Sequence, residues 1–258
     1  MKKITLVCIV FIFSLSHVSN VRCQELHPLY SSILRDYVSN GWVNYKSLKD
    51  DKRLQEYVQQ LTNTNPDTIT DQQDKLAFWI NTYNAFTLKI VCDNYPIESI
   101  NDLHWGGLVI ATILGKTVWA KDLVTINGKD ISLNEIEYDI ISPTFKDPRV
   151  HFALVCASRG CPMLRNEAYE GEKIDSQLNE QARLFLNDPE KNSFDTTQHQ
   201  ATISKIFSWF SEDFGDDDDK VLDYIARYLP PDMADNIRKY VDDWDIDYQD
   251  YDWRLNGE

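Results

Sequence analysis

The sequence predicts an α+β fold of one domain, in which a small, largely antiparallel sheet packs against several helices with one central buried helix. Three observations support this prediction. Residues 76–86 are apolar nearly all round, which is typical of a buried helix. Amphipathic helical patterns lie on both sides of this stretch. The segments of strand length are short, and Asn127-Gly128 between two of them is a strong hairpin signal.

Residues 1–23 have the pattern of a secretory signal peptide. Two lysines form a positive start, and the apolar run after them is too short to span a bilayer. We expect cleavage after Cys23, a single domain over residues 24–258, and export to the periplasm or the extracellular space. Cys23 also suggests a lipoprotein, but Arg22 directly before it argues against lipid anchoring. The alternative is a buried N-terminal helix.

The chain of 258 residues has a formal net charge of −15, and its last 48 residues hold 16 acidic and 5 basic side chains. This balance argues against nucleic acid and anionic membranes as partners. After the signal segment, no stretch is long and apolar enough to cross a bilayer. We therefore expect a small-molecule or peptide ligand, no nucleic acid, and no integral membrane segment in the mature chain.

Three cysteines follow the signal segment, namely Cys92, Cys156 and Cys161. An oxidising compartment allows a disulfide between Cys156 and Cys161. Cys92 would then have no disulfide partner. Three cysteines are too few for a disulfide scaffold, so a hydrophobic core must stabilise the chain. The sequence has no glycine-rich phosphate loop and no Cys/His zinc spacing, so we expect no cofactor.

Two amphipathic helices are expected before the central one. Residues 26–39 have apolar side chains at helical spacing, and Asn40-Gly41 ends that helix. A second helix is marked by the same spacing over residues 54–61.

The central helix is expected to open at Thr70, because Thr70 and Gln73 have the spacing of a capping box. Pro96 follows its end. Asn81 and Asn84 are three residues apart and share one face of this helix. A buried amide needs hydrogen-bond partners, so the pair either ties loops to the core or lines a site.

A hairpin is expected where residues 117–126 and 129–131 flank Asn127-Gly128, since both turn residues suit φ > 0. His104, which comes before this hairpin, is expected at the surface.

A further helix is expected to open at Ser132, which forms a capping box with Glu135. This helix runs to Ile141 and carries Glu137, a carboxylate that can serve as a general base.

Reactive side chains concentrate in residues 147–165. Within this stretch, residues 150–155 form an apolar run of strand length and predict a buried strand. The small residues 157–160 form a loop, and Cys161-Pro162 has the pattern of a helix start. Backbone N–H groups at a helix start are unpaired and favour negative charge.

These residues suggest nucleophilic catalysis by a cysteine, which needs a low pKa, positive surroundings and some exposure. Cys161 has the surroundings better suited to a negative charge, with Arg159 nearby. Arg149 is a further candidate residue of the site. His151 is the obvious base. However, five residues of a straight strand span about 17 Å and place His151 and Cys156 on opposite faces, so the strand must bend or another base must serve. The alternatives are a structural disulfide, two inert thiols, or a thiol–disulfide redox pair.

The rest of the chain predicts further short elements. Residues 174–186 form an amphipathic helix, and a short strand ends at Ile203. Two short helices cover residues 221–229 and 233–241, and the tail from Trp244 alternates like a strand.

Several motifs together resemble the family called domain of unknown function 547 over nearly the whole mature chain. They are residues 78–85, 133–137, 147–154, 156–158 with 161–162, 204–210 with 213–214, and 251–253 with 255–256. Exported bacterial members are common in this family, whose biochemical role is not established. Its plant members keep a cysteine matched here by Cys156 and often have serine at the position of Cys161. Many bacterial members have histidine where this chain has Tyr138.

The leading hypothesis is an exported thiol-dependent hydrolase or acyl-transfer enzyme that acts on a peptide-like or amide substrate. Cys156 would be the nucleophile, His151 or Glu137 the base or its orienter, and Asn81 or Asn84 a donor to the oxyanion. The alternative is a non-catalytic ligand- or protein-binding module, or a thiol–disulfide redox protein. A pocket that joins Cys156 to an imidazole or a carboxylate would favour the enzyme.

Overall fold

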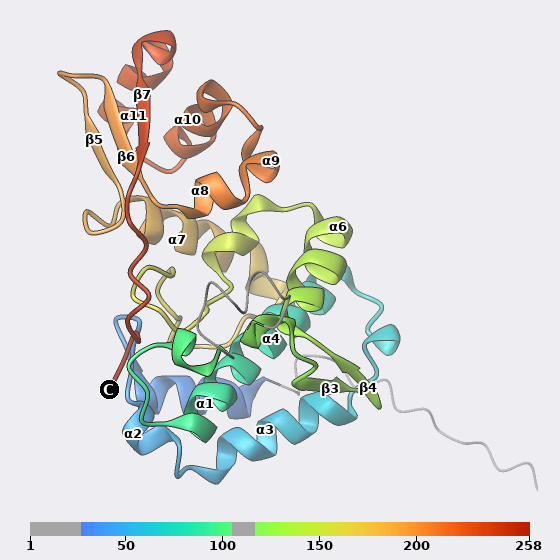
Figure 1. The fold of residues 1–258 in the computed structure, drawn as a ribbon. Coiled ribbons are helices and arrows are strands. Elements are labelled where there is room, and N and C mark those ends of the chain that lie inside the picture. The colour runs from blue at the N-terminus through green and yellow to red at the C-terminus, as the bar shows by residue number, and fades with distance from the viewer. Residues whose placement is uncertain (1–26, 105–116) are drawn as a thin grey trace, which may run out of the picture.

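The structure is a computed structural model that describes residues 27–104 and 117–258. The expected signal segment, residues 1–23, lies outside the described residues. The described residues form helices and three small sheets (Figure 1), which confirms the predicted α+β class. In the part of the chain that the structure describes, no helix is long and apolar enough to cross a membrane.

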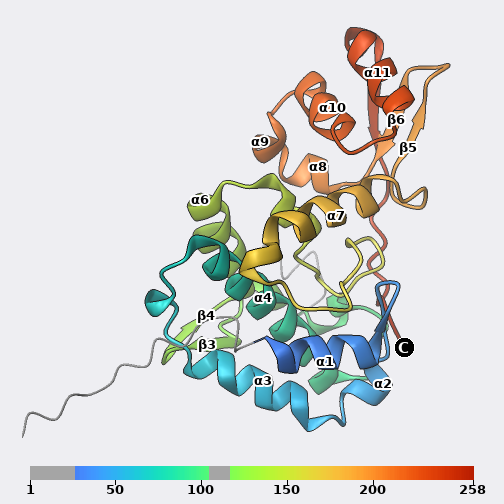
Figure 2. The same ribbon diagram turned by 180° about the vertical axis from the view of Figure 1, so that it is seen from behind.

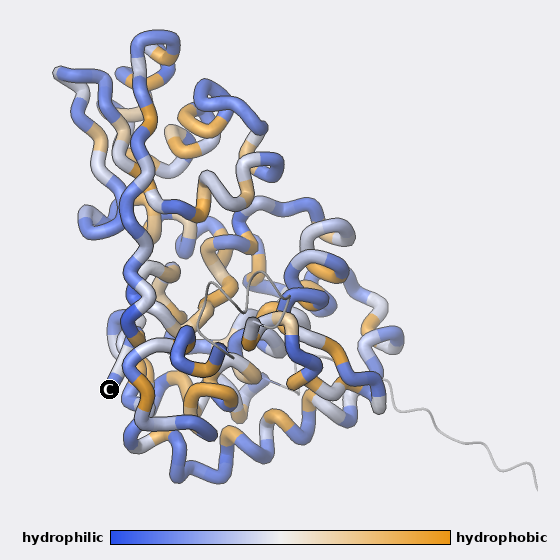
Figure 3. Tube along the Cα trace, viewed as in Figure 1, coloured by the Kyte–Doolittle hydropathy of each residue, from blue (hydrophilic) through white to orange (hydrophobic). Residues whose placement is uncertain are grey.

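The described residues up to 131 form mainly helices and two short hairpins. Their elements are α1 (Pro28–Tyr37), β1 (Val38–Ser39), β2 (Trp42–Val43), α2 (Tyr45–Leu48), α3 (Lys52–Asn63), η2 (Pro66–Thr68), α4 (Gln72–Asn94), η3 (Ile100–Leu103), η4 (Val118–Ala120), β3 (Val124–Ile126) and β4 (Lys129–Ile131). Hydrophobic and hydrophilic residues alternate along α3 (Figure 3), as expected for a helix with one face on the core.

The second half contains a π-helix, η5, and ends in a small three-stranded sheet. Its elements are η5 (Glu135–Ile141), α6 (Ser142–Phe145), η6 (Pro148–Phe152), η7 (Gly171–Lys173), α7 (Ile174–Leu186), β5 (Ser193–Asp195), β6 (Gln200–Ile203), α8 (Ile206–Trp209), α9 (Ser211–Phe214), α10 (Asp218–Ala226), α11 (Pro231–Lys239), η8 (Val241–Asp243) and β7 (Asp245–Tyr248). In this sheet β5 and β6 are antiparallel, whereas β6 and β7 are parallel.

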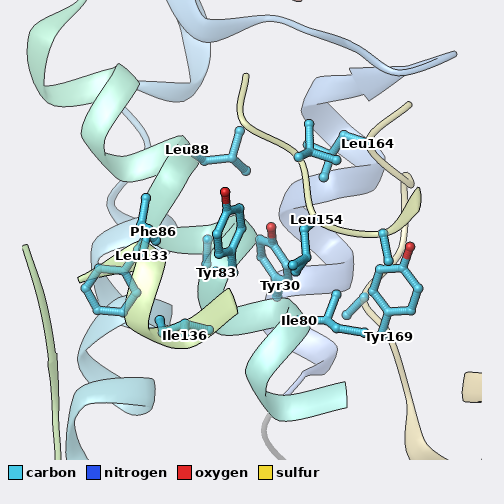
Figure 4. Packing of buried hydrophobic residues seen from close by; sticks show 14 of the residues in the cluster. Tyr30, Ile80, Tyr83, Phe86, Leu88, Leu133, Ile136, Leu154, Leu164 and Tyr169 are labelled. Carbon is cyan, nitrogen blue, oxygen red and sulfur yellow. The ribbon is translucent and has the colours of Figure 1, made fainter. Parts of the chain in front are cut away.

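The helix α4 is the central buried helix that the sequence predicts. Its residues from position 76 to 88 are all buried. Figure 4 shows part of the surrounding core, where Ile80 and Tyr83 of α4 lie among side chains of neighbouring elements. The predicted cap at Thr70 is wrong by one residue. Asp71 caps the helix instead, because its carboxylate accepts the N–H groups of Gln73 and Asp74 at 2.8 and 3.0 Å.

The buried hydrophobic side chains of residues 27–104 and 117–258 form two clusters. The larger one surrounds α4 and includes residues of α1, α3 and the β3–β4 hairpin, and the smaller one lies among α7, α10, α11 and the last sheet. The two parts are stacked, and the chain after β7 runs back along the α4 part to end near α2 (Figures 1 and 2). There the N–H of Lys46 donates to the carbonyl of Glu258 at 3.0 Å.

The hairpin prediction is confirmed. Asn127 and Gly128 have φ values of 50° and 75°, and β3 pairs with β4 in antiparallel register around them. The strand before the turn is shorter than predicted, because residues 118–120 form the 3₁₀-helix η4. The capping box is also confirmed, since Ser132 and Glu135 exchange hydrogen bonds of 3.1 and 2.8 Å.

The predicted strand over residues 150–155 is wrong. Its first half belongs to the 3₁₀-helix η6, which begins with Pro148. The carboxylate of Asp147 accepts the N–H of Arg149 at 3.0 Å and so caps this helix. An Asp-Pro helix start is a specific signal, whereas a short apolar run does not distinguish a strand from a buried helix.

Two further expectations differ from the structure. Residues 161–170 contain no helix, so the helix start expected at Cys161-Pro162 is wrong. His104, expected at the surface, is buried and packs on the ring of Trp119 with 4.8 Å between ring centroids.

Candidate functional site

The segment that carries the two thiols is attached to α4 through an asparagine. Asn84 donates to the carbonyl of Ala153 and accepts the N–H of Val155, both at 2.9 Å. Asn81 makes the same pair of contacts with the backbone of Tyr169, at 2.8 and 2.9 Å. Both amides therefore tie loops to the core, and neither side chain lines the pocket described below.

The C-terminal tail holds the same segment from the other side. The backbone N–H of Arg159 donates to the carbonyl of Arg254, and that of Gly160 to the carbonyl of Asp252, both at 2.8 Å. Before them, Ala157 adopts a left-handed conformation with φ 62°. The thiol loop, residues 156–161, is thus fixed between α4 and the end of the chain.

Three hydrogen-bonding groups surround the sulfur atoms of Cys156 and Cys161. The Sγ of Cys161 accepts the backbone N–H of Cys156 at 3.0 Å and the hydroxyl of Tyr251 at 3.2 Å. The Oγ of Ser158 lies 3.2 Å from the same sulfur. The Sγ of Cys156 lies 3.4 Å from both hydroxyls, and all three described cysteines are free thiols.

These contacts give the two thiols different pKa values. Burial raises the pKa of Cys161, but hydrogen bonds from Cys156, Ser158 and Tyr251 outweigh it and lower the pKa to about 6. The hydrogen bond to Cys161, together with burial, raises the pKa of Cys156 well above its ordinary value. Cys161 is therefore the more acidic of the two thiols.

Tyr251 can reach the sulfurs because residue 160 is glycine. A Cβ at position 160 would lie 2.9 Å from the Tyr251 ring, closer than real Cβ contacts allow. The ring is also packed against Trp209 and Trp253, with centroid distances of 4.7 and 4.6 Å. These contacts position the Tyr251 hydroxyl on the thiols.

Both thiols line a pocket of about 160 Å³ with mainly aromatic walls. Its lining residues among those described are Tyr83, Trp119, Asn134, Glu137, Tyr138, His151, Leu154, Cys156, Cys161, Pro162, Ile206, Trp209, Phe210, Tyr251 and Trp253. The pocket therefore joins Cys156 and Cys161 to an imidazole and a carboxylate.

His151 is held between two carboxylates. Its Nε2 lies 2.7 Å from Oδ2 of Asp213, its Nδ1 lies 3.8 Å from Oε1 of Glu137, and its ring stacks on Phe210 at 3.9 Å. Burial lowers the pKa of His151, but Asp213 and Glu137 outweigh this effect, so the pKa is raised. The imidazolium form is thus favoured in this pocket.

The three elements that hold this group meet at the junction of the two parts of the molecule. Glu137 lies on η5, and π-helical turns occur frequently at functional sites. His151 lies on η6 and Asp213 on α9. Because η6 replaces the expected strand, His151 and Cys156 face one pocket, although no hydrogen bond joins the imidazole to either sulfur.

Arg149 lies apart from the thiols. Its guanidinium pairs with Asp147 at 2.6 Å and Asp175 at 2.7 Å, which links η6 to α7. Arg159, by contrast, lines two cavities beside the thiol loop. Within residues 27–104 and 117–258, no group of three or more His, Cys, Asp or Glu side chains is placed to hold a metal ion.

Sequence reasoning assigned no role to three residues of the site, Ser158, Asp213 and Tyr251. All three lie in motifs that carry the family resemblance, which is the signal that could have identified them. Their roles depend on contacts with residues far away along the chain. Tyr251 lies 95 residues after Cys156, and Asp213 lies 62 residues after His151.

A family model described as a protein of unknown function, DUF547, matches residues 66–186. No curated protein and no solved structure matches the chain. The matched region contains α4, Glu137, His151 and both thiols of the loop, whereas Asp213 and Tyr251 lie after it. The chain therefore carries a domain of the DUF547 family, whose members are proteins of unknown function.

Proposed function

We propose that the protein is a thiol-dependent hydrolase or acyl-transfer enzyme that acts on a peptide-like or amide substrate, with Cys161 as its nucleophile. The observation that supports this best is that the Cys161 sulfur accepts hydrogen bonds from the Cys156 N–H and the Tyr251 hydroxyl. Cys161 also lines a pocket that contains His151 and Glu137. The thiolate is the attacking species, and hydrogen bonds to sulfur keep it ionised near neutral pH. Family resemblance alone favours Cys156, but the hydrogen bonds favour Cys161.

The reaction begins when the Cys161 thiolate attacks the carbonyl carbon. A sulfur–carbon bond forms, and the π electrons of the carbonyl group move to its oxygen. As the sulfur loses its negative charge, the hydroxyls of Tyr251 and Ser158 become available to the new oxyanion. The imidazolium of His151 protonates the leaving nitrogen as the carbon–nitrogen bond breaks, which leaves an acyl thioester.

Water or an amine completes the cycle. Neutral His151 takes a proton from the incoming molecule as it adds to the thioester carbon. Collapse of the second tetrahedral intermediate releases the acid, or the new amide, and restores the thiolate. Glu137 and Asp213 keep the imidazole oriented. In this proposal Asn81 and Asn84 position loops and do not bind the oxyanion, because their amides are engaged with the backbone.

We also propose that the enzyme acts outside the cytoplasm, in the periplasm or the extracellular space. The basis is the signal-like pattern of residues 1–23.

Acylation by an activated ester tests the thiol chemistry. We expect p-nitrophenyl butyrate to give a burst of p-nitrophenol and a butyryl group on Cys161, identified by mass spectrometry. Cys161→Ser should lose both signals. Cys92→Ser is the matched control and should keep them, because Cys92 is buried and lines no part of the aromatic pocket. Butyrylation that misses Cys161, or equal acylation of Cys92, would refute the proposal.

A thiol–disulfide redox function is the second candidate. It is favoured by the contact between Cys156 and Cys161, in which one thiol has a lowered and the other a raised pKa. With oxidised glutathione as the co-reactant, Cys161 would attack one sulfur and release one glutathione, and Cys156 would then displace the second to form the protein disulfide. Rapid formation of this disulfide without ester turnover would favour the redox function over the hydrolase.

A further inference from the structure

Cys161 lines a second cavity in addition to the aromatic pocket. This cavity has a volume of about 270 Å³, and its lining includes Ser158, Arg159 and Lys191. Four of its lining residues are charged, namely Arg159, Asp188, Glu190 and Lys191, whereas the first pocket is mostly aromatic. It is called the charged cavity below. Cys161 therefore lies between the aromatic pocket and the charged cavity.

Arg159 is fixed in place at this charged cavity. Its Nε donates to the carbonyl of Leu255 at 3.2 Å, and its guanidinium lies over the ring of Trp42, 5.0 Å from the centroid. Its two terminal nitrogens make no hydrogen bond or ion pair with any described residue. The side chain thus presents a positioned fork of N–H donors that no described carboxylate contacts directly. Asp252 lies close enough for the guanidinium to help lower the pKa of its carboxyl, but Asp252 is bound by Arg254.

The neighbouring cations are already paired. Lys191 pairs with Asp188 at 2.6 Å, and Arg254 binds the carboxylate of Asp252 through its Nε at 2.9 Å. Asp188 and Glu190 also line the cavity, and their charges oppose anion binding there. An ordered arginine whose terminal nitrogens are not bound by a described carboxylate is suited to a carboxylate from outside.

We propose that Arg159 is a specificity-determining residue that binds a carboxylate of the substrate in the charged cavity, next to the reactive sulfur. The substrate class is then an anionic peptide-like or amide compound, with its carboxylate at Arg159 and its apolar group in the aromatic pocket. This inference rests on the proposed thiol chemistry and names the substrate class of the same site.

Two alkylating reagents of matched shape test the carboxylate site without knowledge of the natural substrate. Iodoacetate and iodoacetamide both form a sulfur–carbon bond with the thiolate and release iodide, but only iodoacetate carries a carboxylate. We expect Cys161 to prefer iodoacetate more strongly than free cysteine does. Arg159→Gln should slow alkylation of Cys161 by iodoacetate by roughly tenfold and leave the iodoacetamide rate unchanged.

Arg254→Gln is the matched control, because it removes the same charge close by from an arginine that already has a partner. We expect it to leave the ratio of the two rates unchanged. The carboxylate site is refuted if Arg159→Gln changes neither rate, or slows both reagents equally, since Arg159 would then act on the thiolate itself. A native Cys161 that reacts with neither reagent would refute the proposed thiol chemistry as well.

Discussion

The ionisation of Cys161 depends on a few donors, and single substitutions can remove them. The hydroxyl of Tyr251 donates to the sulfur from the C-terminal tail, while the backbone N–H of Cys156 donates from within the loop. The sequence places Cys161 beside arginines and an expected helix start. In the structure, its lowered pKa comes instead from hydrogen bonds of the Cys156, Ser158 and Tyr251 side chains. Tertiary contacts therefore decide which of the two cysteines ionises more readily.

Tyr251→Phe should raise the pKa of Cys161. A hydrogen bond to a charged group contributes about 1.5–3 kcal/mol, so its loss corresponds to a rise of about one pKa unit or more. The measurement is the pH dependence of iodoacetamide labelling at Cys161. Tyr138→Phe is the control, because Tyr138 lines the same pocket without contacting a sulfur. Equal shifts in the two variants would contradict the role of Tyr251.

Asp213→Asn should lower stability in a pH-dependent way. The pKa of His151 is raised, so its contribution is fully present below the unfolded value of about 6.5 and is lost as pH rises through the folded pKa. The pKa of Asp213 is lowered, so its contribution is present above the unfolded value of about 3.9 and is lost as pH falls through the folded pKa. We expect the largest decrease in Tm near about pH 5–6.

Thermal melts of both proteins across this pH range measure the effect. Asp223→Asn serves as the control, since Asp223 pairs at 2.9 Å with Arg227, which stays charged throughout. A decrease for Asp213→Asn that is the same at acidic and alkaline pH would show that the ion pair with His151 is not its cause.

Among the elements, those with strong local signals could be predicted from the sequence. The central helix is recognised by its apolar run, and the β3–β4 hairpin by Asn127-Gly128. The apolar pattern of residues 150–155 does not distinguish a strand from a buried helix. The helix start at Asp147-Pro148 is the local signal that favours η6. Of the site, the sequence identified the thiols, His151 and Glu137. The roles of the distant residues arise from tertiary contacts.

Gly128→Val should destabilise the hairpin by roughly 1–2 kcal/mol, because a left-handed residue with a Cβ is strained. The cost comes from the backbone alone, since no atom lies within 4 Å of a Cβ built at Gly128. Lys129→Val is the control, as Lys129 is an exposed residue of β4, where valine is favoured. Urea denaturation measures both variants, and an unchanged midpoint for Gly128→Val would count against the turn.

For the whole molecule, the site lies where the two core clusters meet. Asp213 from the C-terminal part binds His151 of η6, and the chain after β7 brings Tyr251 back onto the thiol loop. The two parts therefore build one pocket together. This arrangement explains why the residues next to the thiols in the sequence did not reveal the roles of Asp213 and Tyr251.

We expect the native protein to begin at or near Gln24, because the charged start and short apolar run of residues 1–15 are typical of a cleaved signal. N-terminal sequencing of the protein isolated from its source cells measures this directly. Retention of Met1 would contradict the expected export.

Alkylation of the reduced native protein by iodoacetamide, from about pH 5 to about pH 9, tests the central claim that Cys161 is the ionised thiol. Mass spectrometry reads each cysteine separately. We predict that Cys161 is labelled first, with a midpoint near its pKa of about 6, while Cys156 and Cys92, whose pKa values are raised, are labelled slowly throughout. A Cys161 midpoint at or above the value of about 8.5 for free cysteine, or faster labelling of Cys156, would contradict the account.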